Sequence, residues 1–268
     1  MSSPYKIGFL GGGNMAGAII KGILGSALYP PETLCVFDIS EEKRSFFSSQ
    51  GLSVAESEEA LFSRCDTVFL CVKPQVAPDI LGKLGAVSKG KLLITIMAGI
   101  SSGYISELLG GGVRVVRAMP NTPLLLGSGT VALSAGVGAE ECDVALAETI
   151  FSASGSVYRI PEEKMNDVIP VNGSSPAFFY LFAKYIADFG QACGFDRQAS
   201  IEMAASTMVG SGKMMLESGY SPEELIQMVS SPGGTTLKGL EAFYQSDLEQ
   251  IVQHACEETA KRAYELGK

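Results

Sequence analysis

The sequence predicts an α/β domain with a mostly parallel sheet, followed by an all-α domain. In residues 1–160, short apolar runs alternate with amphipathic stretches that are long enough to be crossover helices. Runs such as "TVFLCV" and "LLITI" are apolar throughout, as strands buried on both faces of a parallel sheet are. After Pro161 the β-branched clusters disappear and helical patterns follow. We therefore expect two domains, residues 1–160 and residues 161–268.

The elements of the first domain follow from these runs. The expected strands cover residues 6–10, 34–38, 67–72, 92–96, 113–118, 130–134 and 156–159. Most segments between them are long enough for helices, which we expect at residues 15–25 and 101–109 among others. This alternation predicts helices on both faces of the sheet.

The second domain is expected to contain only helices. The stretch "PAFFYLFAKYIADFGQA", residues 176–192, is apolar on most of its faces and predicts a helix buried on several sides. Further helices are expected at residues 197–217, at residues 221–228, and from residue 235 to the C-terminus with a break near residues 245–247. The sequence Ser221-Pro222-Glu223-Glu224 has the form of a capping box.

Composition excludes several classes of protein. Apolar residues make up 46% of the chain and charged residues 18%, and the net charge of -9 is unsuitable for a nucleic-acid binder. With one histidine and six cysteines that form no CxxC pair, we expect no metal site and buried thiols in a reducing compartment. No apolar run approaches the roughly 20 residues of a membrane span, and a strand follows the N-terminus too closely for a signal peptide. We expect a cytoplasmic protein.

A glycine-rich turn follows the first expected strand. In "IGFLGGGNMAGAII", Gly11 allows a tight turn, Gly13 lets a pyrophosphate approach the backbone, and Ala16 permits close packing of helix on strand. The alternative is an ordinary tight turn between strand and helix. Because the turn opens a long α/β series, we favour a Rossmann-like dinucleotide-binding domain. The cofactor-binding residues expected in this turn are Gly11, Gly12, Gly13, Asn14 and Met15.

An acidic residue, Asp38, ends the second expected strand. A carboxylate there accepts hydrogen bonds from both ribose hydroxyls of NAD and repels the 2′-phosphate of NADP, so NADH is the favoured cofactor. The alternative role is an N-cap of the helix that begins near Ser40. Lys43 and Arg44 are close enough in sequence to leave NADPH open.

Two later loops should also border the cofactor. Ligands of open α/β sheets lie outside the carboxyl ends of the strands. The loop that contains Val72, Lys73 and Pro74 and the loop that contains Ala98 and Gly99 each follow such an end. Taken singly, each loop could equally be a plain connection.

Together these segments resemble the pyrroline-5-carboxylate reductase family over nearly the whole chain. The matching stretches are "IGFLGGGNMAGAIIKG", "LCVKPQ", "MAGI", "RAMPNTP", "NGSSPAFFY" and "VSSPGGTTLKGL", of which the last is the most specific. Two departures are "NGSSP" at residues 172–176, where the family commonly has Ser-Gly-Ser-Gly-Pro, and residues 56–59, where members often carry an asparagine.

The resemblance implies an activity and an assembly. The activity is reduction of 1-pyrroline-5-carboxylate to L-proline, the last step of proline biosynthesis, by hydride transfer from NADH or NADPH. The assembly is a homodimer built from interlocked C-terminal helices, often joined further into rings. On this basis residues 161–268 are expected to bind the substrate and to form the dimer.

The resemblance also assigns a role to "SSPGGTTLKG", which interrupts the helical half of the chain. A substrate carboxylate needs donors, and a helix that opens with Gly-Gly-Thr-Thr offers unpaired backbone amides. The expected substrate-binding residues are Ser231, Gly233, Gly234, Thr235 and Thr236. We expect the hydroxyl of Thr236 to bond the ring nitrogen of the imine, as the catalytic group. The alternative is a helix–helix turn capped by threonine.

Two other functions fit the two-domain plan less well. The 3-hydroxyacid and 6-phosphogluconate dehydrogenases share the two-domain plan, but they resemble one another in a catalytic lysine close after a glycine-rich turn, with an asparagine four residues on. Here the nearest such lysine, Lys184, is far from Gly173, and the residue four positions after it is Asp188 instead of an asparagine. The second reading, a nucleotide-sensing protein without turnover, is disfavoured by the intact loop at residues 230–236.

Overall fold

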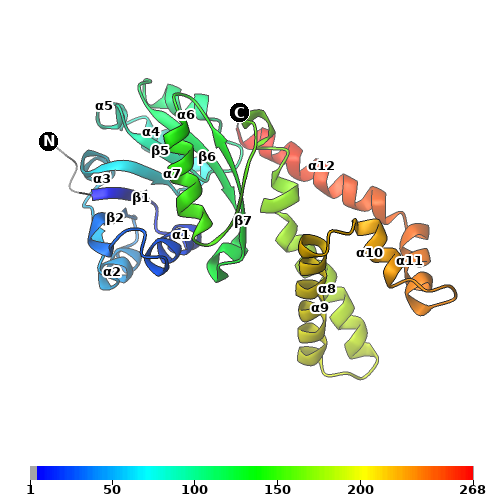
Figure 1. The fold of residues 1–268 in the computed structure, drawn as a ribbon. Coiled ribbons are helices and arrows are strands. Elements are labelled where there is room, and N and C mark those ends of the chain that lie inside the picture. The colour runs from blue at the N-terminus through cyan, green and yellow to red at the C-terminus, as the bar shows by residue number, and fades with distance from the viewer. Residues whose placement is uncertain (1–4, 268) are drawn as a thin grey trace. The chain divides into compact units, whose positions relative to one another are not determined.

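The computed structural model describes residues 5–267 and divides into two compact units (Figure 1). The first unit runs through Ser174 and takes up the chain again from Glu258, and the second unit is Ser175–Glu257. The expected boundary at residue 160 therefore lies inside the first unit. Residues 161–174 and 258–266 pack with the sheet rather than with the other helices.

The first unit is built on one eight-stranded sheet of order β3-β2-β1-β4-β5-β6-β7-β8. Neighbouring strands are parallel except for the antiparallel pair β6–β7, which confirms the mostly parallel sheet. The strands are β1 Tyr5–Leu10, β2 Leu34–Phe37, β3 Ser53–Val54, β4 Cys65–Leu70, β5 Leu92–Thr95, β6 Arg114–Pro120, β7 Gly129–Ala135 and β8 Gly155–Arg159. The seven expected strands are present, and β3 was not predicted.

Helices cover both faces of this sheet. Successive side chains of its central strands point to opposite faces, so each face carries apolar side chains that helices bury. Phe9 and Phe69 stack side by side within one apolar cluster, whereas Leu10 and Leu70 belong to a second cluster. Helices α1 and α7 contribute to the first cluster, and α3, α4 and α6 to the second. The helices of this unit are α1 Asn14–Gly25, α2 Glu41–Ser49, α3 Glu58–Arg64, α4 Ala77–Leu81, α5 Gly85–Ser88, α6 Ser102–Leu108 and α7 Glu141–Ser152.

A third, smaller cluster explains where the first unit ends. Met165 and Ile169, which lie beyond the expected domain boundary, pack with Met119 of β6 and Ala132 of β7. Ala263, near the C-terminus, completes this cluster and is buried. Burial of these apolar side chains holds the segment after β8 and the end of the last helix on the sheet.

The second unit consists of helices, as expected. They are α8 Ser175–Ala192, α9 Arg197–Glu217, α10 Pro222–Met228, α11 Thr235–Gln245 and α12 Leu248–Leu266, the last of which continues into the first unit. The capping box at Ser221 is confirmed: Ser221 Oγ accepts the N–H of Glu224, and the Glu224 carboxylate accepts the N–H of Ser221. The break before α12 falls at Asp247, whose φ is 52°.

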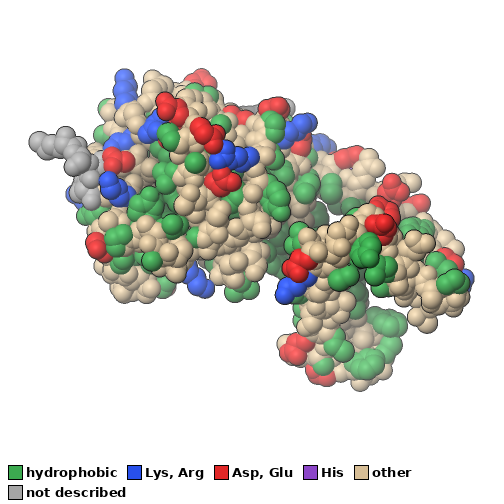
Figure 2. Space-filling view, in the orientation of Figure 1, with side chains coloured by type: hydrophobic (Ala, Val, Ile, Leu, Met, Phe, Trp, Pro, Cys, Tyr) green, Lys and Arg blue, Asp and Glu red, His purple; other side chains and the backbone are tan. Residues whose placement is uncertain are grey.

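Burial of α8 on several sides is not achieved within one chain. Phe179, Tyr185 and Phe189 are 56%, 60% and 72% exposed. Exposed apolar side chains also occur in the α8–α9 loop, at Phe195, and in α9, at Met215, and Figure 2 shows apolar atoms gathered at the end of the α8–α9 hairpin. The predicted burial of α8 on several sides therefore requires contact with a surface from outside this chain.

Two further expectations concern the cysteines and the membrane. All six cysteines have free thiols, and Cys35 and Cys65 are buried, but Cys142 and Cys193 are exposed, so the expectation of buried thiols is wrong for these two. They lie at the start of α7 and just after α8, where the helix surface faces solvent. Within residues 5–267, no helix combines the length and the apolar character needed to cross a bilayer.

Candidate functional site

The glycine-rich turn has the geometry expected of a phosphate-binding turn. Gly11 has a φ of 99°, and a Cβ on it would lie 2.8 Å from the carbonyl oxygen of Cys71. Gly13 is the N-cap of α1 in an extended conformation with no side-chain cap, and a Cβ on it would meet nothing within 4 Å. Asn14 and Met15 begin the helix, whose first turn carries no acidic residue. The start of α1 is therefore open to an anion and has a favourable dipole.

Asp38 lies directly beside this turn. Its Oδ2 accepts the N–H of Gly12 at 2.8 Å and lies 3.3 Å from Lys43 Nζ, and its Oδ1 accepts the N–H of Ser40 at 2.9 Å. Burial raises the pKa of Asp38, but the hydrogen bonds from Ser40, Gly12 and Lys43 outweigh burial and hold this pKa below its ordinary value. The guanidinium of Arg44 donates to the carbonyl of Asp38 at 2.6 Å. The carboxylate is thus ionised, and both basic side chains lie at the end of β2.

The helix-capping alternative for Asp38 is not what the structure has. The N-cap of α2 is Ser40, whose Oγ accepts the N–H of Lys43. The Asp38 carboxylate instead joins the end of β2 to the glycine turn after β1. Gly12 is confined as well, since a Cβ on it would lie 2.7 Å from the ring of Phe47 in α2.

The loop after β4 lies next to the glycine turn. Cys71 donates its N–H to the carbonyl of Leu10 at 2.8 Å, and a Cβ on Gly11 would lie 3.3 Å from the nitrogen of Val72. Lys73 is exposed and precedes a short 3-10 helix that starts at Pro74. The structure thus brings the predicted residues of the first two loops together.

The loop after β5, residues 96–101, is the next along the sheet. Ala98 is partly exposed, but Gly99 is buried, has a φ of 81°, and lies against the end of α12. Ala98 also lines a pocket of about 470 Å³ together with Ile169, Ser174 and Arg262. Sites for small ligands have volumes of this order.

The sheet order divides these loops into two halves. The order reverses between β1 and β4, and a dinucleotide binds across such a switch point with one mononucleotide on each side. Asp38, on the β2 side, would meet the adenosine half. The loops after β4 and β5 would meet the nicotinamide half.

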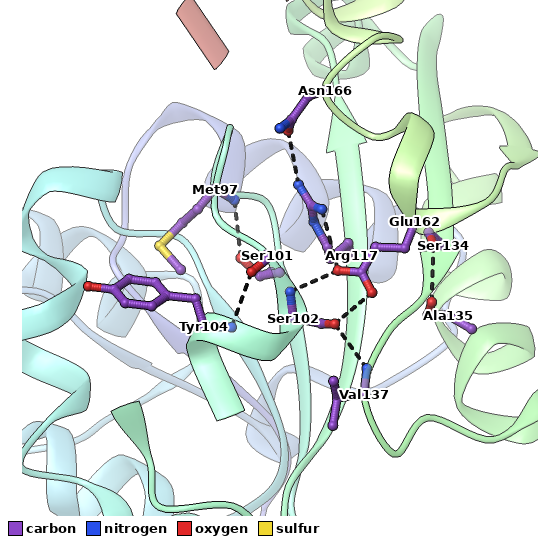
Figure 3. Close-up of polar contacts among 11 residues, drawn as sticks. Met97, Ser101, Ser102, Tyr104, Arg117, Ser134, Ala135, Val137, Glu162 and Asn166 are labelled. Carbon is purple, nitrogen blue, oxygen red and sulfur yellow. Dashed lines mark hydrogen bonds and ion pairs between the residues drawn. The ribbon is translucent and has the colours of Figure 1, made fainter. Parts of the chain in front are cut away.

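A polar cluster fixes the far end of the β5–α6 loop (Figure 3). Both oxygens of the Glu162 carboxylate bind Ser102: Oε1 accepts its N–H at 2.8 Å and Oε2 accepts its hydroxyl at 2.6 Å. Arg117, buried in β6, donates to Glu162 Oε1 at 3.4 Å and to Asn166 Oδ1 at 3.3 Å. Burial lowers the pKa of Arg117, and the charge of Glu162 opposes that change.

Two buried asparagines join the segment "RAMPNTP" to the residues before α8. Asn121 donates to the carbonyl of Asn172 at 3.1 Å and accepts the N–H of Thr130 at 2.9 Å, and Asn172 donates to the carbonyl of Met119 at 2.7 Å. Asn172 lies in a π-helix, Ile169–Gly173. Its Oδ1 is buried without a hydrogen-bond partner among the residues that the structure describes.

The predicted substrate loop lies in the second unit, before α11. Gly233 has a φ of 74°, which favours glycine, and a Cβ on Gly234 would lie 2.9 Å from the backbone carbonyl oxygen of Ser231. The carbonyl of Ser231 accepts the N–H of Gly234 at 2.9 Å. Thr235 and Thr236 are exposed, and neither caps the helix.

The amides that follow are free to bind an anion. Within residues 5–267, the N–H groups of Thr235, Thr236 and Leu237 have no acceptor, and the first bond along the helix runs from Lys238 to Gly234. The helix is 11 residues long and has no acidic residue in its first turn. This part of the prediction therefore has the donors that a carboxylate needs.

Sequence reasoning gave no role to Arg117, Glu162 or Ser102. Arg117 belongs to the segment "RAMPNTP", and Glu162 lies in no segment that carries a prediction. A signal was present, because an arginine inside the apolar strand "VRVVRAMP" must find a buried partner. The identity of that partner, from a segment far along the chain, is set only by the fold.

Comparisons with known proteins agree with this arrangement. Residues 162–266 match the family described as pyrroline-5-carboxylate reductase dimerisation, and residues 6–99 match the family described as NADP oxidoreductase, coenzyme F420-dependent. The pyrroline-5-carboxylate reductase of Arabidopsis thaliana is 34% identical over 269 residues, which cover 100% of this chain and 97% of that protein. The enzyme of the same name from Methanosarcina acetivorans is 33% identical, with 98% of each chain covered.

A solved structure is similar over the whole chain as well. The crystal structure of Plasmodium falciparum pyrroline carboxylate reductase with NADP bound has a TM-score of 0.91 and 28% sequence identity, and the match covers 100% of both chains. The similarity to named relatives thus extends over both units, including the glycine turn and the loop before α11. This chain belongs to the pyrroline-5-carboxylate reductase family.

Proposed function

We propose that this protein reduces 1-pyrroline-5-carboxylate to L-proline with NADH or NADPH, as the last step of proline biosynthesis. The observation that carries the proposal is the full-length similarity to pyrroline-5-carboxylate reductases, at 34% identity to the Arabidopsis protein. The free thiols support the cytoplasm as the proposed compartment.

The residues of the first unit fit a dinucleotide. Gly13 leaves the backbone uncovered at the start of α1, and the ionised Asp38 lies next to the turn. The chemistry that the dinucleotide supplies when bound is a hydride for the imine carbon. Within the protein, Gly11, Gly12, Gly13, Asn14 and Met15 would hold its pyrophosphate.

The other cofactor-binding residues are proposed from the strand order. Asp38 would bind the adenosine ribose, and Val72, Lys73, Pro74, Ala98 and Gly99 would border the nicotinamide half. Gly99 would contribute through its backbone, since it is buried.

The loop before α11 is proposed to hold the substrate. The carboxylate of the substrate would accept hydrogen bonds from the backbone amides of Thr235 and Thr236, which have no other acceptor among the described residues. Ser231, Gly233 and Gly234 would shape this cradle. The Thr236 hydroxyl would bond the ring nitrogen, which must carry a proton for the imine carbon to accept a hydride readily.

NADH is the proposed preferred cofactor. An ionised carboxylate at Asp38 repels a 2′-phosphate and accepts hydrogen bonds from ribose hydroxyls. Lys43 is already engaged by this carboxylate, and Arg44 by backbone carbonyls. Both basic groups therefore have partners that a 2′-phosphate would need to displace.

The protein is proposed to act as a homodimer formed by the second unit, and the dimers are proposed to assemble further into rings. The support is the match of residues 162–266 to a dimerisation family and the exposed apolar side chains of α8. A second copy would remove these side chains from water.

The direct test is an assay in which the protein oxidises NADH or NADPH in the presence of 1-pyrroline-5-carboxylate. The loss of reduced-nicotinamide absorbance monitors the oxidation, and mass spectrometry identifies proline as the product. 3-Hydroxyacids and 6-phosphogluconate with the oxidised cofactors are the controls. Turnover of a control substrate without proline formation would contradict the proposal. Cofactor binding without any turnover would favour a nucleotide-sensing protein.

A further inference from the structure

The β5–α6 loop, residues 96–101, is anchored at its helix end by a residue from a distant part of the chain. Glu162 belongs to a short 3-10 helix after β8, and its two carboxylate oxygens bind the backbone N–H and the hydroxyl of Ser102 (Figure 3). Ser102 is the first residue of α6. Its hydroxyl in turn accepts the N–H of Val137 at 3.0 Å. One carboxylate thus fixes the point at which this loop ends.

The rest of the loop is held by other contacts. At the strand end, Met97 donates its N–H to Thr95 Oγ1 at 3.2 Å, and Met97 and Ile100 are buried in the apolar cluster below. Ser101 caps α6 by accepting the N–H of Tyr104 at 3.1 Å. Ala98 remains partly exposed between these fixed points.

We propose that Glu162 is a positioning residue that sets the β5–α6 loop for the nicotinamide half of the cofactor, and that Arg117 keeps its carboxylate in place. The inference rests on the proposed dinucleotide site, in which the loops after β4 and β5 border that half. Glu162 acts through Ser102 and does not itself touch the cofactor.

The charge on Glu162 is part of this role. Its carboxylate accepts from two donors on Ser102 while it faces the buried guanidinium of Arg117 at 3.4 Å. A glutamine has one acceptor oxygen in place of two, and it leaves Arg117 without its counter-charge. Glu162→Gln should therefore loosen the loop at almost constant side-chain volume.

The neighbouring Glu163 offers a matched control. Glu163 is exposed and makes no side-chain hydrogen bond or ion pair with the residues that the structure describes. Glu163→Gln changes the net charge by the same amount at the adjacent position. Any difference between the two variants then reports the contacts of Glu162.

The experiment measures the binding of two ligands and, separately, the hydrogen exchange of the ligand-free protein. Binding of NADH and of ADP-ribose, which keeps the adenosine half and the pyrophosphate but lacks nicotinamide, is measured for wild type, Glu162→Gln and Glu163→Gln. We expect the Kd for NADH to rise about tenfold in Glu162→Gln alone. Binding must then order a loop that has lost one charge-assisted hydrogen bond between residue 162 and Ser102, and that loss corresponds to about a tenfold change in Kd. The Kd for ADP-ribose should stay unchanged. Hydrogen exchange of the ligand-free protein should become faster in residues 96–104.

Each other outcome overturns the inference or tests a separate claim. NADH affinity and exchange like those of wild type would show that Glu162 does not position the loop. An equal loss for both probes would assign it a general structural role instead. If wild type binds neither NADH nor NADPH, the proposed function fails, and hydrogen exchange still decides whether Glu162 holds the loop. Should Glu162→Gln not fold, Ser102→Ala, which keeps the backbone bond to Glu162 but removes the hydroxyl's bonds with Glu162 and Val137, should show the same pattern.

Discussion

A side chain at Gly99 would clash with the end of α12 within the first unit. Its φ of 81° disfavours any residue with a Cβ. A Cβ there would also lie 2.9 Å from the Leu266 side chain and still closer to the carbonyl oxygen of Ala263, both in α12. Real Cβ atoms essentially never come within 3.0 Å of other heavy atoms, so Gly99→Ala must displace the end of α12.

The expected cost has two parts. A left-handed conformation costs an alanine roughly 1–2 kcal/mol. Overpacking against the backbone of α12 adds roughly 1–3 kcal/mol. Gly90→Ala isolates the first part, because Gly90 has a φ of 74° and a Cβ on it would meet nothing within 4 Å. We expect Gly99→Ala to lose about 1–3 kcal/mol more than Gly90→Ala.

Urea denaturation of the ligand-free protein, followed by circular dichroism, measures both losses in free energy of unfolding. Limited proteolysis should cut near residues 258–266 in Gly99→Ala and not in Gly90→Ala. Equal losses of stability in the two variants would refute the reasoning, because the contact with α12 would then contribute nothing.

Three further predictions concern the proposed enzyme. In steady-state kinetics, Thr236→Ala should lower kcat about 10²–10⁴-fold, and Thr236→Ser should retain most activity. A binding titration should find the Kd of Thr236→Ala for NADH unchanged. A kcat of Thr236→Ala within about threefold of wild type would leave the hydroxyl without a chemical role. kcat/KM should be higher with NADH than with NADPH because of Asp38, and the opposite ranking would make Lys43 or Arg44 a phosphate ligand. Light scattering at low micromolar concentration should detect no monomer, so a fully active species of 28.2 kDa would contradict the dimer.

Most strands and helices could be predicted from the sequence because their signals are local. The first four residues of the run "TVFLCV" lie in β4, and the capping box at Ser221 marks the start of α10. β3 was missed because two residues, Ser53 and Val54, form no apolar run, and their pairing with β2 is a tertiary contact. The domain boundary was placed by a change of composition, which cannot reveal that Met165 and Ala263 are buried in one cluster.

The candidate site divides in the same way. Gly11 and Asp38 could be assigned a place because a turn and a strand end are sequence features, and the structure brings them together through Gly12. The bond from Ser102 to Glu162 spans 60 positions in sequence and leaves no local pattern. The partner of Glu162 is therefore known only from the fold.

The return of α12 to the sheet has a consequence for synthesis on the ribosome. Domains generally fold as units with the N-terminal one first. Here the glycine turn and the sheet precede the second unit in the chain, whereas residues 258–266, which complete the cover of Met119 and Gly99, follow it. The first unit is therefore completed only after the second unit has been translated, and until then the nascent chain leaves part of this apolar surface uncovered.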